Sequence, residues 1–321
     1  MYLYSLTNKK LHSIMSLLTK DKVTEIFCMV DDFCQEYHHE IQKNKSLPVI
    51  KEKKTRNRSH LMSDSEIMTI LMLYHFGSFK NFKHFYLMYI GVTLRSEFPI
   101  QLSYNRFIAI EHKVFTPMML FLNLCCFGEC TGITFVDSTK ISVCHNKRIF
   151  NHKVFKDLAQ RGKSTMGWFY GFKLHFVCNE NGEIISFFFS PGNTDDRDIN
   201  VFNVLKKKLF GKLYGDKGYV SAPLFEQLFQ EGIHIVTGLK VNMKNRLMPI
   251  LDKIMLRKRS VIETINDQLK NICDIEHSRH RSIHNFFMNL IAALGAYSFF
   301  DKKPSIRMER TYEKKQLSLF F

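Results

Sequence analysis

Apolar residues recur at helical spacing through the first third of the chain, which predicts a helical N-terminal region over residues 1–125. Within residues 1–42 the periodic apolar positions are Leu17, Val23, Ile26, Phe27, Val30 and Phe33. Ser63 and Glu66 have the capping-box spacing that opens a second helix, which we expect to end at Gly77. Further helices are predicted from about residue 81 to 89 and after Ser103. These short helices fit a helix-turn-helix DNA reader and a purely structural helical domain equally well.

From residue 131 the pattern changes to short apolar runs with strand-like alternation. Three strands, of which the first ends at Asp137, are followed by alternating helices and strands, while residues 138–169 are polar and irregular. The predicted strands are 133–137, 170–178, 183–190, 212–216 and 234–237, and the predicted helices end near residues 209, 230, 270 and 300. The order β-β-β-α-β-α-β-α predicts an α/β fold, a mixed sheet with helices on its faces.

The helix predicted over residues 256–270 has two different faces. At about 100° per residue its apolar side chains gather on one side; they are Val261, Ile262, Ile265, Leu269 and the nearby Ile272. Arg259, Glu263 and Lys270 fall within roughly 40° of one another on the other side. Taken alone, this is the pattern of a surface helix with an i,i+4 ion pair, worth a few tenths of a kcal/mol.

Charge and composition narrow the choice of partner. The 321 residues carry a net charge of +16, and 45% are hydrophobic, so the chain can build a large core and favours a polyanionic partner. Among polyanionic partners, this charge favours nucleic acid first and an anionic membrane surface second. Residues 43–60 form a basic arm with seven Lys or Arg against one Glu, which suits a solvated linker or phosphate contact.

Targeting signals are not evident in the sequence. The apolar stretches 115–128 and 286–300 are too short to span a membrane, and the N-terminus has no signal-peptide core. Eight cysteines without a CxxC pair are typical of reduced intracellular thiols. These features predict a cytoplasmic protein with no membrane partner.

Acidic residues follow two of the predicted strands. In the predicted sheet the first strand is central and the fourth lies beside it, so Asp137 and Asp216 come close, and the helix that carries Glu263 packs across them. Three converging carboxylates repel one another unless a hard cation neutralises them. Two divalent ions, Mg²⁺ or Mn²⁺, about 4 Å apart would activate a nucleophile at a phosphodiester. Arg259 and Lys270 would then contact the DNA backbone.

These residues carry a resemblance. The stretches 135–139 and 215–219, and the spacing of Arg259, Glu263 and Lys270, resemble the three signature blocks of DDE transposases of bacterial insertion sequences, which have a ribonuclease-H-like core. More narrowly, the chain resembles the insertion sequence 982 family over roughly residues 16–305, with further matching stretches at 168–175, 192–197, 242–245 and 276–282. The resemblance implies that Asp137, Asp216 and Glu263 are the metal-binding catalytic triad. Leu256 departs from the pattern, because many DDE transposases place Tyr there.

Other basic and acidic positions have two interpretations. Lys217, Lys173, Arg279 and Arg281 are candidate DNA contacts; Lys173 and His175 equally suit a satisfied half-buried pair, and the two arginines could cover a domain seam. Asp195, Asp196 and Asp198 fit helix capping or an acidic cluster behind the triad. We expect a catalytic domain over residues 126–305 and a basic tail over 306–321.

The resemblance implies a transposase that hydrolyses a phosphodiester at the ends of its element and joins the 3′-OH to target DNA. Its partners would be double-stranded DNA, both terminal inverted repeats and target, bound by a dimer in the nucleoid. The alternatives are a nuclease of the same fold without strand transfer and a non-catalytic DNA-binding derivative.

Overall fold

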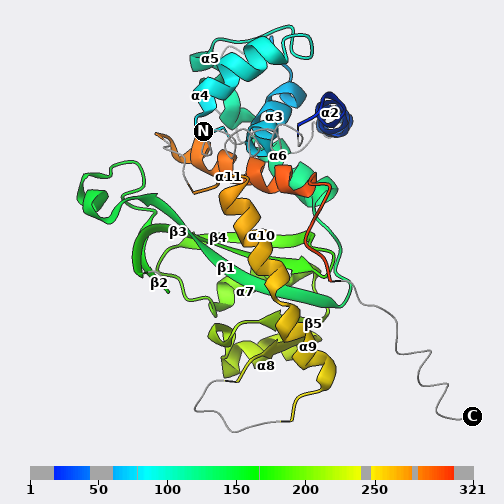
Figure 1. Cartoon of the computed structure of the whole chain (residues 1–321), viewed down its shortest axis with the longest axis vertical. Coiled ribbons are helices and arrows are strands. Elements are labelled where there is room, and N and C mark those ends of the chain that lie inside the picture. The colour runs from blue at the N-terminus through cyan, green and yellow to red at the C-terminus, as the bar shows by residue number, and fades with distance from the viewer. Residues whose placement is uncertain are drawn as a thin grey trace, which may run out of the picture.

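The computed structural model describes residues 18–43, 61–77, 79–165, 167–239, 247–276 and 281–306. A layer of helices lies against a mixed sheet, and one long helix crosses from the first to the second (Figure 1). The helices of the first layer are α2 (Lys20–Lys43), α3 (Asp64–Leu73), α4 (Phe82–His84), α5 (Tyr104–Ile110) and α6 (Phe115–Phe121). Short 3₁₀ and π segments join them: η1 (Tyr74–Phe76), η2 (Phe85–Thr93), η3 (Glu111–Val114) and η4 (Leu122–Cys126).

The helix starts predicted at Ser63 and Ser103 are confirmed. Ser63 Oγ accepts a hydrogen bond from the Glu66 amide at 3.1 Å, and Glu66 accepts one from the Ser63 amide at 2.7 Å, which completes the capping box. Ser103 caps α5 through the Arg106 amide in the same way. The first helix begins at Lys20 and buries Val23, Ile26 and Val30, whereas residues 1–17 and the predicted basic arm from 44 to 60 lie outside the described residues.

In the described part of the chain, six strands form the sheet: β1 (Ile133–Cys144), β2 (Gln160–Ser164), β3 (Gly167–Asn179), β4 (Ile184–Pro191), β5 (Gly211–Gly215) and β6 (Ile233–Thr237). The order is β2-β3-β1-β5-β6, and β4 also pairs with β3. β1 is antiparallel to β3 and parallel to β5, so the first strand is central and has the predicted neighbour.

The prediction that residues 138–169 are irregular was wrong. β1 continues to Cys144, so Asp137 lies within a strand, and β2 adds a strand that the predicted order lacks. Along this part of β1, Thr139 and Ile141 are buried while Lys140 and Ser142 are not. The strand alternation is therefore present, but it falls on polar residues, which conceal it.

The two faces of the sheet build two cores, because neighbouring residues on a strand point to opposite sides. Val136 and Leu213 pack with α7 (Ile199–Leu205) and α8 (Ala222–Gln230). Phe135 and Tyr214 belong to the other core, with α10 (Ser260–Asn271). α10 buries the predicted apolar face: Val261, Ile262, Ile265 and Leu269. The single helix expected over residues 256–270 is wrong. The chain forms two helices, α9 (Ile250–Lys258) and α10, and Arg259 lies between them as the C-cap of the first and the N-cap of the second.

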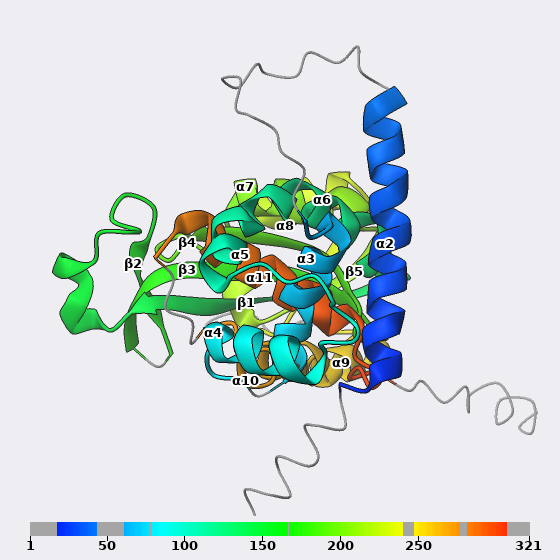
Figure 2. The same ribbon diagram turned by 90° about the horizontal axis from the view of Figure 1, so that it is seen from above.

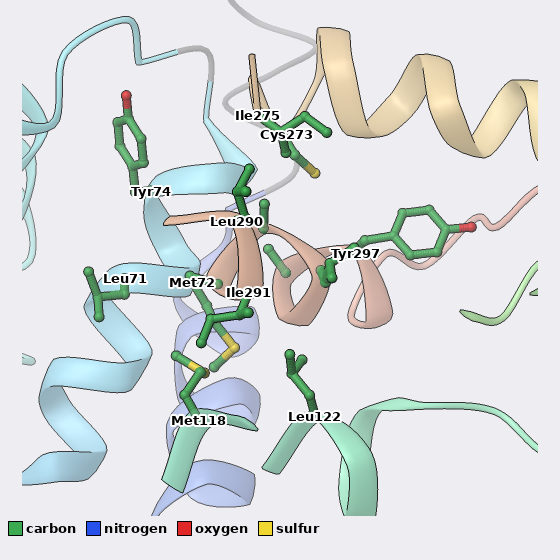
Figure 3. Close-up of a cluster of buried hydrophobic side chains, with 14 of the residues drawn as sticks. Leu71, Met72, Tyr74, Met118, Leu122, Cys273, Ile275, Leu290, Ile291 and Tyr297 are labelled. Atoms are coloured by element: carbon green, nitrogen blue, oxygen red, sulfur yellow. The ribbon is translucent and has the colours of Figure 1, made fainter. Parts of the chain in front are cut away.

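The last helix, α11 (Ile283–Ser298), packs among the N-terminal helices (Figure 2). Its Leu290 and Ile291 lie in one cluster with Met72 of α3 and Met118 of α6, and Cys273, just past the end of α10, joins the same cluster (Figure 3). This buried cluster is continuous with the core on the α10 face of the sheet. The helical layer therefore holds α10 in place from its C-terminal end, while the sheet holds its middle.

One segment of the described chain, Tyr104–Cys126, is long and apolar enough to cross a membrane by length and composition, which the sequence analysis did not find. It comprises α5, η3, α6 and η4 in succession. Phe107, Met118 and Phe121 are fully buried in the helical layer, where they form part of its core.

Candidate active site

The pairing of two parallel strands bears on the positions of Asp137 and Asp216. Phe135 of β1 pairs with Tyr214 of β5, and their rings stack with centroids 5.5 Å apart on the α10 face of the sheet. Asp137 lies two residues after Phe135 within β1, and Asp216 is the first residue after β5. Because side chains alternate along a strand, both aspartates are expected on that face.

Gly215, just before Asp216, makes room for the ring of Tyr219. A Cβ on Gly215 would lie 3.1 Å from the ring of Tyr219 and 3.2 Å from Val136, so a larger residue there would press on the buried ring. Tyr219 is 4% exposed and packs with Phe202 of α7. The 3₁₀ turn that follows β5, η7 (Lys217–Tyr219), is thus fixed to the core by Tyr219, and Asp216 at its start stays exposed.

The helix α10 lies across β1 and supplies the third carboxylate. Asn266 donates a hydrogen bond to Asp137 Oδ2 at 2.9 Å, which joins the helix directly to the strand. One turn earlier, Glu263 is exposed and accepts a hydrogen bond from Arg259 at 2.5 Å. The guanidinium of Arg259 also lies 3.9 Å from Asp137 Oδ1. Arg259 therefore sits between the strand carboxylate and the helix carboxylate.

Asp137, Asp216 and Glu263 carry carboxylates, which are the donors that a hard divalent cation prefers. Among the residues that the structure describes, no three His, Cys, Asp or Glu side chains are arranged to hold a metal ion. Arg259 already forms an ion pair with Glu263 and lies 3.9 Å from Asp137. The carboxylates thus fit the predicted ions in kind, and Arg259 would have to give up its contacts when an ion binds.

The environment of Asp137 disfavours its charge. The pKa of the Asp137 carboxyl is raised from 3.8 to about 6, mainly by burial and also by the charges of Glu263 and Asp196, while Arg259 acts in the opposite direction. This holds although 22% of the side-chain surface remains accessible. A cation that comes within contact distance would stabilise the ionised form of this carboxylate.

A polar cluster lies on the other face of the same strands. Ser138, directly opposite His175 in the sheet, donates to Asp196 at 2.8 Å, and Lys173 pairs with Asp196 at 3.0 Å. His175 is 1% exposed, and burial lowers its pKa to about 4, so its ring is neutral. His175 Nδ1 and the Tyr219 hydroxyl are buried without a hydrogen-bond partner among the described residues.

The three aspartates before α7 divide between the two interpretations. Asp198 is the N-cap of α7 and accepts a hydrogen bond from the Asn200 amide at 2.8 Å, while Asp195 forms an ion pair with Arg197 at 2.6 Å. Asp196 instead reaches the polar cluster beside Asp137. Capping thus explains Asp198, Asp195 is held by Arg197, and Asp196 contacts Ser138 and Lys173, so the three aspartates do not form one acidic cluster.

The predicted DNA contacts lie in several environments. Lys173 is half-buried and engaged by Asp196 and by the Thr194 carbonyl at 2.7 Å, so its contacts favour the satisfied pair. Lys270 is 3.5 Å from Glu276, near the far end of β1. Lys217 is exposed directly after Asp216, and Arg281 is exposed beside α11. Arg279 lies outside the described residues.

Sequence reasoning missed Asn266 and Glu276. Asn266 is three residues after Glu263, on the same side of α10, so the helical period contained a signal for it. Glu276 receives hydrogen bonds from Ser142 and pairs with Lys270, contacts between residues far apart in sequence that no local pattern indicates.

Comparisons with known proteins support the class of enzyme. Residues 127–283, which contain the three carboxylates, match the family model described as "Transposase DDE domain", and this match supports a transposase with a DDE domain. A solved structure, that of the piggyBac transposase synaptic complex with hairpin DNA, is similar with a TM-score of 0.40 and 13% identity, covering 95% of this chain and 78% of that chain. No curated protein matches the chain.

Proposed function

We propose that this chain is the transposase of a bacterial insertion sequence of the 982 family. It cleaves a phosphodiester at each end of its element and joins the freed 3′-OH to target DNA. The core has the ribonuclease-H-like arrangement, in which the central strand and its parallel neighbour carry the first two acids. The enzyme works in the cytoplasm, as a dimer that holds two DNA ends.

One observation carries the proposal most directly. Strand alternation points Asp137 of β1 and Asp216, just after β5, toward the face that α10 crosses, and α10 carries Glu263 beside the cation of Arg259. A fold gains no stability from such an arrangement, since burial makes the charge on Asp137 unfavourable. The segment matched to the transposase domain contains all three acids.

Each residue of the site has a proposed role. Asp137, Asp216 and Glu263 would hold two Mg²⁺ or Mn²⁺ ions, which when bound lower the pKa of the attacking hydroxyl and stabilise the leaving oxygen of the phosphodiester. Asn266 orients Asp137 through its hydrogen bond. Without metal or DNA, Arg259 offsets part of the negative charge of Asp137 and Glu263. If these carboxylates held metal ions, Arg259 would be free to contact a phosphate oxygen.

Cations around the site would position the DNA backbone. Lys217 is exposed next to Asp216 and can contact a phosphate beside the reacting one. Lys270 would do so further along α10 after exchanging Glu276 for phosphate. The net charge of +16 adds long-range attraction, so binding should weaken steeply as salt is added.

The test uses supercoiled plasmid that carries the ends of the element, incubated with the protein and Mg²⁺. Asp137→Asn, Asp216→Asn and Glu263→Gln should each lower cleavage about a thousandfold or more, because each removes charge that the metal site needs. Asp267→Asn is the matched control, since Asp267 is an exposed carboxylate on the same helix. Wild-type cleavage by any of the three triad variants would remove that residue from the proposal.

The same reaction separates the alternatives. A transposase yields joined products in which element ends are covalently linked to target DNA, whereas a nuclease yields only cut ends. A non-catalytic derivative would bind the plasmid and leave it supercoiled. Supercoiled plasmid that persists with wild-type protein and Mg²⁺ would therefore contradict the proposed function.

A further inference from the structure

A basic extension projects from the sheet between β1 and β3. It comprises residues 145–168, of which all but Met166 are described. We call this extension the arm; it is distinct from the basic segment 43–60. Figures 1 and 2 both show it reaching away from the helical layer and from α8. It contains six Lys or Arg residues and one Asp, and the cations are exposed: Lys147, Arg148, Lys153, Lys156, Arg161 and Lys163. Charge of this sign and density suits a phosphate backbone.

Two large aromatic rings are exposed on the same arm. Trp168 is 62% exposed and Phe150 is 90% exposed. Lys163 faces the ring of Trp168 at 5.9 Å, and Arg161 faces that of Phe150 at 5.7 Å. These contacts leave most of each ring open to solvent. Exposed aromatic faces interleaved with cations are the pattern of surfaces that bind unpaired nucleotides, because every base has a face on which a ring can stack.

The hairpin presents these groups on one side. Lys163 and Trp168 are directly opposite in the β2–β3 pairing, and Arg161 lies two residues from Lys163 on the same face. Between them Gly162 and Phe169 are buried on the other face. At the root, the 2% exposed Phe155 packs on Phe172 and on Phe286 of α11. The arm is therefore anchored in the core and its outer face is held in position.

A groove connects the arm to the active-site strand. Its volume is about 950 Å³, and its lining includes Lys140 and Ser142 of β1, Lys147 and Arg148 of the arm, Trp168 and Glu276. The one acid, Glu276, is engaged by Ser142 and Lys270. Ser142 is five residues from Asp137 on β1, a span of about 17 Å at 3.3 Å per residue.

We propose that the arm binds unpaired DNA bases, with Trp168 and Phe150 as stacking faces and the surrounding cations on the phosphates. The proposal deepens the proposed function, since it names the DNA segment that the arm receives beside the cleavage site. Duplex DNA is the less suitable ligand, because its bases are already stacked on one another and offer their faces only at the ends.

Because Trp168 is the only tryptophan in the chain, its fluorescence reports on this site alone. A single-stranded oligothymidylate of about 20 nucleotides, longer than the usual site size, should quench it saturably, and a blunt duplex of equal length should quench it far less. Trp168→Ala and Phe150→Ala should each weaken binding of a labelled oligothymidylate about 5- to 150-fold, and Trp168→Phe should retain most of the affinity. Phe229→Ala is the control, since Phe229 is a half-exposed ring on α8, away from the arm.

Two outcomes would overturn the arm proposal: unchanged fluorescence at saturating oligothymidylate, or equal quenching by the duplex. Equal affinities of Trp168→Ala and Trp168→Phe would do the same. These outcomes are separate from the proposed function. Missing quenching in a protein that still cleaves with Mg²⁺ contradicts the arm alone, and missing cleavage in a protein with full quenching contradicts the transposase reaction alone.

Discussion

Replacing Asp137 by asparagine should stabilise the metal-free protein near neutral pH, although it removes a residue on which the proposed catalysis depends. Asparagine has the shape of the protonated carboxyl and can still accept the hydrogen bond from Asn266. It lacks the charge that burial and the neighbouring carboxylates make unfavourable. The folded protein should therefore tolerate asparagine better than the ionised aspartate.

The pKa of Asp137 sets the size and the sign of this effect. A rise from 3.8 to about 6 corresponds to about 3 kcal/mol, at about 1.4 kcal/mol per pKa unit. Because the folded state holds the proton more tightly than the unfolded state, the contribution to stability is present below pH 3.8 and is lost as pH rises through about 6. Near neutral pH, Asp137→Asn should raise the free energy of unfolding by about 1–3 kcal/mol.

Urea unfolding followed by circular dichroism, in buffer with a metal chelator, measures the effect. The stability difference between variant and wild type should shrink as pH falls from neutral toward 3.8. Saturating Mg²⁺ and DNA should narrow it as well, because ligands that bind only the folded wild type stabilise it by mass action. If Asp137→Asn is the less stable protein near neutral pH without metal, or if the difference does not depend on pH, the reasoning about Asp137 is refuted.

Three further predictions test other parts of the molecule. Ser63→Ala should lower the free energy of unfolding by about 1 kcal/mol through loss of the α3 cap, with cleavage unchanged, and urea unfolding beside a plasmid assay would expose any other pattern. Asn266→Ala should slow cleavage about tenfold because Asp137 loses its orienting hydrogen bond; single-turnover rates at saturating Mg²⁺ measure this, and an unchanged rate would deny Asn266 that role. Asp252→Ala should destabilise the fold by about 2 kcal/mol, since the buried Tyr214 hydroxyl loses its acceptor at 2.8 Å, whereas an unchanged urea midpoint would mean that water replaces it.

Much of the secondary structure followed from short-range patterns. The apolar face of α10 and the cap at Ser63 depend on residues within one or two helical turns, and both were predicted. The continuation of β1 past Asp137 was not, because its buried positions include Thr139 and its exposed positions are as polar as a loop. The break between α9 and α10 at Arg259 was also missed, since no proline or glycine marks it.

Some features of the candidate site were also predictable from the sequence, and others were not. The pairing of β1 with β5 was expected from the order of the elements and is confirmed, whereas the closeness of Asp137 and Asp216 stays a prediction that follows from this register. The choice of Asp196 over Asp195 and Asp198 depends on the path of the loop before α7, which three adjacent aspartates do not specify. The guanidinium between Asp137 and Glu263 likewise becomes visible only when α10 is laid on the sheet.

The packing of α11 among the N-terminal helices could not have been predicted from local pattern either. Its residues are almost uniformly apolar, which indicates burial but not against what. Leu290 and Ile291 contact helices that lie more than half the chain away, and such pairings depend on the shape of the whole core.

The central claim is that Asp137, Asp216 and Glu263 hold divalent ions at one site. Electron paramagnetic resonance of Mn²⁺ counts bound ions directly, in the presence of DNA ends and independently of cleavage. The wild type and Asp267→Asn should bind about two ions per chain, and Asp137→Asn, Asp216→Asn and Glu263→Gln should each lose at least one. Mn²⁺ binding by all three triad variants at the wild-type level and affinity would contradict the account.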